Sequence, residues 1–142
     1  MLTSEYLVYL RGQVSAEEWE ELRLGGEHLD INEHNLDAML QLGSYKLATD
    51  DPEINDDLAA RLEQSLWDYL DKYMTDRPNA EKWIVLACLF LALVARRPMH
   101  PIDRAGVEIL HNEDGTLKYI CPLKKPGESL ICDCCVCEAK GK

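Results

Sequence analysis

The sequence has little positive charge. Its 142 residues include 15 Lys and Arg against 26 Asp and Glu, which gives a formal net charge of −11. Basic side chains supply most of the affinity of proteins for nucleic-acid phosphates and for anionic membrane surfaces, so we expect the protein to bind neither. The acidity is uneven: residues 1–97 carry nine basic and nineteen acidic side chains, whereas residues 98–142 carry six and seven. The C-terminal part therefore differs from the rest in composition.

Long hydrophobic runs are also absent. The longest apolar stretch, "WIVLACLFLALVA" at residues 83–95, is shorter than the ~20 residues that cross a bilayer. The first residues, "MLTSEYLVYLRGQ", lack the basic start, apolar run and cleavage site of a signal peptide. We therefore expect a cytoplasmic protein without a membrane segment, whose thiols stay reduced.

Motifs of common catalytic and ligand sites are missing. The sequence contains neither a phosphate-binding glycine loop nor a Gly-x-Ser-x-Gly element, and the acidic run at residues 50–57 lacks the glycine and final glutamate of an EF-hand. His28 and His34 lie among acidic residues, and we interpret their segment as a solvated connection between helices. Candidate chemistry is therefore confined to the cysteines.

The first 97 residues have the apolar spacing of helices. Residues 51–77 repeat apolar side chains at every fourth position, with Asp51 as the expected N-cap and Pro52 as the first helical residue. A helix over residues 80–97 would be apolar on nearly every face, so other helices must surround it. Further helices are expected over residues 4–12, over residues 15–26 with a Ser15–Glu18 capping box, and over residues 32–50. These patterns predict a mainly α fold, a small helical bundle around a central apolar helix.

Residues 98–142 follow a different pattern. The stretch "VEILHNEDGTLKYICP" predicts a β-hairpin with strands at residues 107–110 and 116–120 and a turn at residues 112–115. Five of the six cysteines also lie in this part of the chain. We therefore expect residues 98–142 to form a hairpin and cysteine-rich, metal-binding lobe that packs on the helical bundle of residues 1–97 as one compact unit.

Four cysteines occur within six residues of the segment "SLICDCCVCEAKGK". Zinc prefers four tetrahedral thiolate and imidazole ligands, and a two-residue gap allows two thiolates to reach one ion. That gap occurs twice, as Cys132 with Cys135 and as Cys134 with Cys137. The two pairs interleave, so both cannot easily hold the same ion. Clustered cysteines in a reducing compartment more often bind metal than form disulfides, so we predict a zinc site.

The remaining zinc ligands must come from other segments. Cys121 ends the second predicted strand, and His100 follows the apolar helix. A mixed site of His100, Cys121, Cys132 and Cys135 suits zinc, and the alternative is Cys121 with three of the tail cysteines. Cys88 lies inside the apolar helix, where we interpret it as a packed hydrophobic side chain and not a ligand.

The elements "RPMHP", "YICPLKK" and "CDCCVCEAK" together resemble an uncharacterised protein family of methanogenic archaea. Its pattern has a helical N-terminal region, a His-Pro element, a Tyr-x-Cys-Pro or Tyr-Cys-Pro element and a Cys-x-x-Cys near the C-terminus. The resemblance extends from Arg97 onward and implies that the family's elements fall at His100, Cys121, Cys132 and Cys135. Cys134 and Cys137 depart from the pattern and stay alternative ligands. The resemblance implies no activity, because the family has none assigned.

Three functions are compatible with this sequence. The first is a structural zinc closed by four protein ligands, in a protein whose acidic helical face meets a basic protein partner. The second is a metalloenzyme with an open zinc position and Asp103 or Glu108 as the base. The third is thiol redox chemistry or metal handling through Cys134 and Cys137. These are distinguished by the number of protein ligands at the metal and by the reactivity of the tail thiols.

Overall fold

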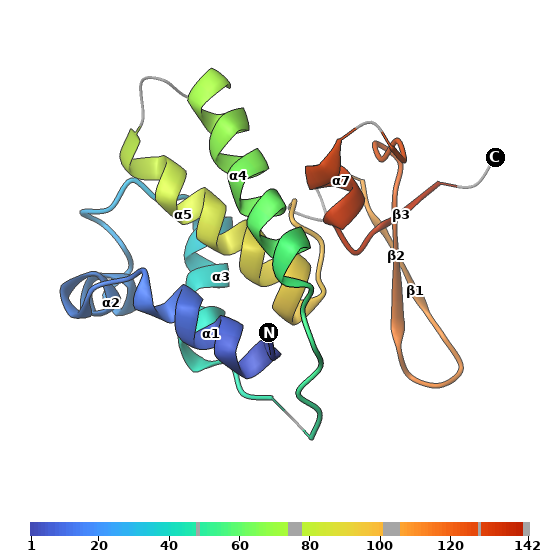
Figure 1. Cartoon of the computed structure of the whole chain (residues 1–142), viewed down its shortest axis with the longest axis horizontal. Helices are drawn as coiled ribbons and strands as arrows, with labels where there is room; N and C mark the ends of the chain where they lie inside the picture. The colour runs from blue at the N-terminus through green and yellow to red at the C-terminus, as the bar shows by residue number, and fades with distance from the viewer. Residues whose placement is uncertain (48, 74–77, 101–105, 128, 141–142) are drawn as a thin grey trace.

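The computed structural model describes residues 1–47, 49–73, 78–100, 106–127 and 129–140. It confirms a mainly helical fold with a small C-terminal sheet (Figure 1). The helices and strands are α1 (Thr3–Gly12), α2 (Ala16–Arg23), α3 (Glu33–Ser44), α4 (Asp56–Tyr73), α5 (Pro78–Leu89), η1 (Phe90–Ala95), β1 (Glu108–His111), β2 (Leu117–Cys121), α7 (Leu130–Cys134) and β3 (Glu138–Ala139). None of the helices described has the length and apolarity that a bilayer crossing requires.

The apolar stretch at residues 83–95 forms α5 and, as a π-helical continuation, η1. α5 contacts α3 and α4, while η1 contacts α1 and α3, so neighbouring helices bury most of its side chains. Phe90 is completely buried, and Trp83 is nearly so. Ile84 and Cys88 are only partly buried. Because they are four residues apart on one helix, they share a face of α5, and this face is important for the candidate site.

The start of α2 agrees with the sequence pattern. The Ser15 hydroxyl accepts a hydrogen bond from the Glu18 amide at 3.1 Å, and the Glu18 carboxylate accepts one from the Ser15 amide at 3.0 Å. This reciprocal arrangement is the predicted capping box. Glu18 also pairs with the Lys82 ammonium at 2.7 Å, which links α2 to α5. The pair is partly buried at both ends.

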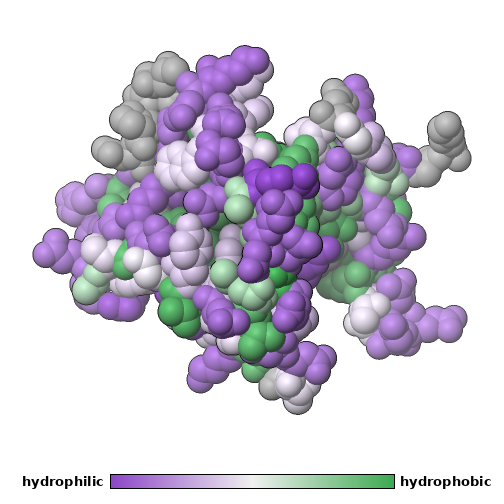
Figure 2. All heavy atoms as spheres, viewed as in Figure 1, coloured by the Kyte–Doolittle hydropathy of each residue, from purple (hydrophilic) through white to green (hydrophobic). Residues whose placement is uncertain are grey.

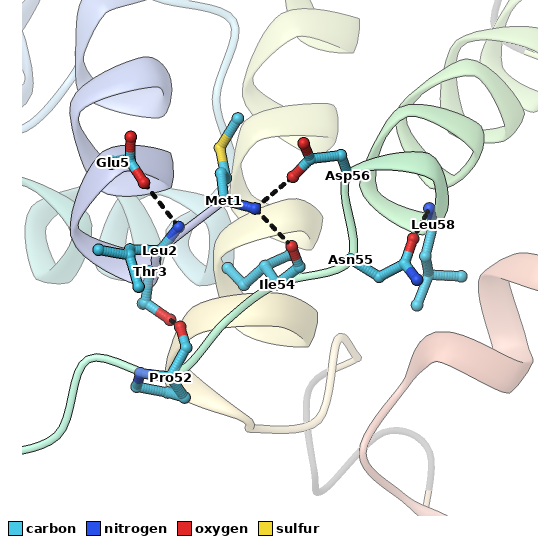
Figure 3. A network of polar contacts seen from close by, with 9 residues as sticks. All are labelled: Met1, Leu2, Thr3, Glu5, Pro52, Ile54, Asn55, Asp56 and Leu58. Carbon is cyan, nitrogen blue, oxygen red and sulfur yellow. Dashed lines mark hydrogen bonds and ion pairs between the residues drawn. The ribbon is translucent and has the colours of Figure 1, made fainter.

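The predicted start of α4 is wrong. The helix begins at Asp56, several residues after the expected cap, Asp51, and the expected first helical residue, Pro52. The Asn55 side chain instead accepts a hydrogen bond from the Leu58 amide at 2.9 Å and so caps the helix (Figure 3). Asp51 cannot cap α4 because its carboxylate is bound elsewhere, 47 residues away in the sequence.

The segment before α4 pairs with the N-terminal residues. Leu2 and Glu53 form an isolated antiparallel bridge, and the N-terminal ammonium of Met1 contacts both the Ile54 carbonyl and the Asp56 carboxylate (Figure 3). The flanking hydrogen bonds run from the Ser4 amide to Asp51 (2.8 Å), from the Thr3 hydroxyl to the Pro52 carbonyl (2.6 Å), and from the Ile54 amide to the Met1 carbonyl (2.7 Å). These contacts occupy the polar groups that a longer α4 would have needed.

The predicted hairpin is present, with each strand displaced by one residue. β1 pairs antiparallel with β2 from Glu108 opposite Ile120 to His111 opposite Leu117. β3, which the sequence did not predict, adds to the other edge of β2 in parallel and brings Ala139 opposite Cys121. The short α7, also not predicted, contacts α4. The cysteine segment is therefore held on one side by the sheet and on the other by the helices (Figure 1).

The two parts of the chain differ in their buried cores. The main cluster of buried side chains comes mostly from the helices, with Val14, Ile54 and Met99 added from the segments between and after them. A second, small cluster contains Val107, Cys121 and Cys137, with Tyr119 and Cys135 packed against it. Hydrophilic residues cover much of the face of the molecule shown in Figure 2. The C-terminal segment, residues 98–142, therefore buries few apolar side chains in a cluster of its own where the structure describes it.

Candidate functional site

A pocket of about 410 Å³ lies between the helices and the C-terminal segment. This volume falls in the range of small-molecule and cofactor sites, roughly 300–1,000 Å³. One wall is apolar and comes from α4 and α5, including Leu66, Leu70 and Ile84. The residues around the pocket that carry polar groups include five with thiols, two with imidazoles, two with hydroxyls, two with amides and one with an ammonium group: Cys88, Cys121, Cys132, Cys135, Cys137, His34, His100, Tyr69, Ser129, Asn32, Asn35 and Lys124.

The residues predicted to bind zinc, His100, Cys121, Cys132 and Cys135, all line this pocket, and so does the alternative ligand Cys137. They come from the segment after η1, from the end of β2 and from the segment that includes α7. Within the described part of the chain, no group of three or more His, Cys, Asp or Glu side chains is arranged to hold a metal ion. The fold therefore gathers the donors around one space but does not assemble them into a coordination sphere.

Cys134, the other alternative ligand, is not among the pocket-lining residues. It packs with Ile131 against the main core of the helices. Burial raises the pKa of its thiol, and the neighbouring Asp133 carboxylate adds to this effect. The tail cysteines are therefore in different environments, although they follow one another closely in the sequence.

Four of the pocket thiols lie between α5 and β2. Cys88 and Cys135 both pack against the main core, and Cys135 also packs against the small cluster that contains Cys121 and Cys137. Burial raises the pKa of both the Cys88 and Cys137 thiols to about 12, and in each case the neighbouring thiol raises it further. At neutral pH these two groups are therefore thiols rather than thiolates in the absence of a metal ion.

Cys88 packs against the core, as the sequence suggested, but it also faces the pocket. Sequence reasoning did not predict that Cys88 lines the same pocket as Cys135. The sequence does not indicate which face of α5 is exposed, because nearly every residue of this stretch is apolar. The partial exposure of Ile84 and Cys88 becomes evident only when the neighbouring helices are in place.

Lys124 anchors the cysteine segment. Its ammonium donates hydrogen bonds to the carbonyl oxygens of Cys135, at 2.9 Å, and Cys137, at 2.5 Å. Cys135 packs against both the main core and the small C-terminal cluster. Lys124 therefore holds the backbone where the two parts of the chain meet. Nothing in the sequence distinguishes this lysine from the adjacent Lys125.

The two imidazoles at the pocket have different roles. His34 lies in the first turn of α3, and its Nε2 is 2.8 Å from the Met99 carbonyl oxygen. The interpretation of His34 as part of a solvated connection is therefore wrong, because the side chain links α3 to the segment after η1. His100 is exposed and follows directly after this link. The contact at Met99 thus positions the chain from which His100 reaches the pocket.

Of the two candidate bases for an open zinc site, Asp103 lies outside the described residues. Glu108 lies on β1, is not among the pocket-lining residues, and is 3.8 Å from the Lys140 ammonium. Neither position supplies an observed base at the pocket. Glu108 is therefore not placed to act as a base at the pocket.

The fold and the pocket define a mainly helical protein with a thiol-lined site at its C-terminal segment. Residues 27–140 match a family described as uncharacterised proteins conserved in archaea (DUF2115), and because this match covers most of the chain, the protein belongs to that family. The match confirms the resemblance to an uncharacterised archaeal family and extends it from Arg97 back to residue 27. Comparisons with curated proteins and with solved structures found no match.

Proposed function

We propose that the protein binds a structural zinc ion at the thiol-lined pocket through His100, Cys121, Cys132 and Cys135. The supporting observation is that these four side chains line one pocket although they come from segments separated in the sequence. Thiolate and imidazole groups are the ligands that zinc prefers in structural sites. Four protein ligands would close the ion to substrate, which is typical of a structural role.

The need for an ion follows from the small core of the C-terminal segment. Its own buried cluster consists of Val107, Cys121 and Cys137. Apolar burial on this scale offsets little of the conformational entropy lost on ordering a segment of this length, and small units of this kind are commonly stabilised by a metal. Zinc would connect the hairpin and the tail to the segment that follows η1, and its binding energy would contribute to folding.

Zinc binding requires some movement of the donors, because those described are not arranged around a common point. Cys121 and Cys137 are buried in one small cluster against which Cys135 packs, whereas Cys132 lies on α7 outside that cluster. Two sets of cysteine ligands are therefore alternatives. In one, Cys132 and Cys135 bind the ion, as the spacing predicts, and in the other Cys137 replaces Cys132.

The test is elemental analysis of the full chain purified in the presence of zinc. We expect one equivalent of zinc in the unmodified protein and its loss in His100→Ala and Cys121→Ser. The matched controls are His111→Ala, at an exposed position on β1, and Cys134→Ser, which is not at the pocket. Both controls should retain zinc. Retention of zinc by His100→Ala and Cys121→Ser would refute the mixed site.

Two further measurements refine this result. Comparison of Cys132→Ser with Cys137→Ser shows which of the two cysteines is a zinc ligand, because the variant that lacks a ligand should release the ion. Removal of zinc by a chelator should lower the melting temperature, since an ion that binds only the folded state stabilises it. A melting temperature that is unchanged by chelation would exclude the structural role even if zinc binds.

A further inference from the structure

We infer that the pocket between the helices and the C-terminal segment binds a small uncharged molecule in which an aromatic ring carries a carboxamide group. Asn35 is the residue that recognises the carboxamide. It lines the pocket, although it is only 7% exposed. This inference goes beyond the zinc proposal and does not depend on it, because Asn35 is not one of the proposed zinc ligands.

The Asn35 backbone is fixed, whereas its side-chain amide has no hydrogen-bond partner among the described residues. Its backbone amide donates a hydrogen bond to the Asn32 side chain at 2.8 Å, in the first turn of α3. Within the described part of the chain, the Tyr6 hydroxyl is the side-chain atom that is both fully enclosed and without a partner. The Asn35 amide is therefore not fully enclosed, and the space that it reaches is the pocket that Asn35 lines. Because buried polar groups are nearly always hydrogen-bonded, this amide is suited to anchor a ligand.

The other residues of the pocket favour an uncharged ligand. Leu66, Leu70 and Ile84 give it an apolar wall, and none of the described lining residues is Asp, Glu or Arg. The Lys124 ammonium already donates hydrogen bonds to two carbonyl oxygens. A charged ligand would lose its hydration and would find no carboxylate and no unbound ammonium or guanidinium group in exchange, which is costly.

Two exposed apolar side chains at the pocket suit a flat ring. Tyr69 and Leu123 both line the pocket, and they are 54% and 70% exposed. A ring that enters the pocket covers apolar surface of both, and removal of such surface from water favours binding. The Asn35 amide offers a donor and an acceptor, and a carboxamide presents the complementary acceptor and donor. The volume of about 410 Å³ accommodates a molecule of this kind.

The experiment titrates the full chain, purified in the presence of zinc, with benzamide, benzoate and toluene and follows the protein by NMR. The assigned side-chain amide signals of Asn35 report the polar contact, and the methyl signals of Ile84 report the apolar wall. We expect saturable shifts of both with benzamide, weaker binding of toluene with shifts at Ile84, and no saturable shift with benzoate. Absence of a saturable benzamide shift at Asn35, or binding of benzoate as tight as that of benzamide, would overturn the inference.

A variant without the amide tests the role of Asn35. Asn35→Leu replaces the amide by an apolar group of similar size. Its affinity for benzamide, measured at Ile84, should fall about five- to tenfold, the effect of one lost hydrogen bond, while its affinity for toluene stays the same. Equal affinities of folded Asn35→Leu and the unmodified protein for benzamide would contradict this role.

A second pair of variants applies even if circular dichroism shows that Asn35→Leu is unfolded. Tyr69→Ala should weaken the binding of both benzamide and toluene, since the pocket loses part of its apolar lining. Tyr73→Ala is the matched control, because this tyrosine is 61% exposed on the same helix and is not among the described lining residues. Equal affinities of these two variants for benzamide would overturn the inference. Zinc content is measured separately, so the zinc proposal and this one can fail independently.

Discussion

The helical part and the C-terminal segment are stabilised in different ways. The helices bury a large cluster of apolar side chains around α5 and η1. Among the described residues of the C-terminal segment, 106–127 and 129–140, a separate buried cluster contains only Val107, Cys121 and Cys137. The C-terminal segment depends instead on strand pairing, on Lys124 and on the packing of α7 against the helices. The pocket lies where these two kinds of structure meet.

The largest expected effect comes from the helical core. Phe90→Ala should lower the free energy of unfolding by about 3–5 kcal/mol, because the side chain is completely buried and its removal leaves a cavity. Urea denaturation followed by circular dichroism measures the change. Leu123→Ala is the control in the C-terminal segment, since its side chain is 70% exposed, and it should have little effect. Equal losses of unfolding free energy in the two variants would contradict the view that the helical part depends more on apolar burial than the C-terminal segment does.

A smaller and local effect is expected at Lys124. Lys124→Met removes a charged donor from two carbonyl groups, and one hydrogen bond to a charged group contributes about 1.5–3 kcal/mol. Amide hydrogen exchange should become faster in α7 and β3 but stay unchanged in α5. Lys125→Met is the matched control, because this neighbouring lysine is exposed. Faster exchange throughout α5 in Lys124→Met would mean that the two parts unfold together.

Removal of the N-cap of α4 should lower the free energy of unfolding by about 1 kcal/mol. Asn55→Ala removes the side-chain oxygen that accepts the Leu58 amide, and loss of an N-cap typically costs about 0.5–2 kcal/mol. Thermal denaturation should show a lower melting temperature. Asn55→Asp retains the acceptor and should stay close to the unmodified protein. If Asn55→Ala is as stable as Asn55→Asp, the cap is not at this residue.

The smallest effect concerns the N-terminal contacts and depends on pH. Hydrogen bonds from the Ser4 hydroxyl and amide lower the pKa of the Asp51 carboxyl below its ordinary value of 3.8. A group whose pKa is lower in the folded state contributes stability above its unfolded pKa, and this contribution is lost as the pH falls through the folded pKa. Melting temperatures between pH 6 and pH 2 should therefore fall less steeply for Ser4→Ala. An unchanged slope below pH 4 would contradict this assignment.

The sequence predicted those parts of the fold that depend on residues close together in the chain. The capping box at Ser15, the apolar helix that includes Phe90 and the hairpin turn before Thr116 each depend on residues a few positions apart. The start of α4 was predicted wrongly because Asp51 and Pro52 have the local pattern of a helix start. Their polar groups are instead bound by residues near the N-terminus, and a local pattern contains no information about such partners.

The candidate site shows the same division. Spacing identified most of the cysteines that line the pocket, and their role as zinc ligands stays a prediction. Spacing could not show that Cys88 lines the same pocket as Cys135, that Cys134 does not line it, or that Lys124 and not Lys125 binds the tail carbonyls.

The sequence by itself determined the helical periodicity, the hairpin and the concentration of thiols near the C-terminus, because these depend on composition and on short-range spacing. The tertiary structure decided which thiols are neighbours and which part of the chain each one faces. Four consecutive positions of the tail, Cys132 to Cys135, include thiols at the pocket and one that packs away from it. Their surroundings come from α4, α5 and β2, which only the folded chain brings together.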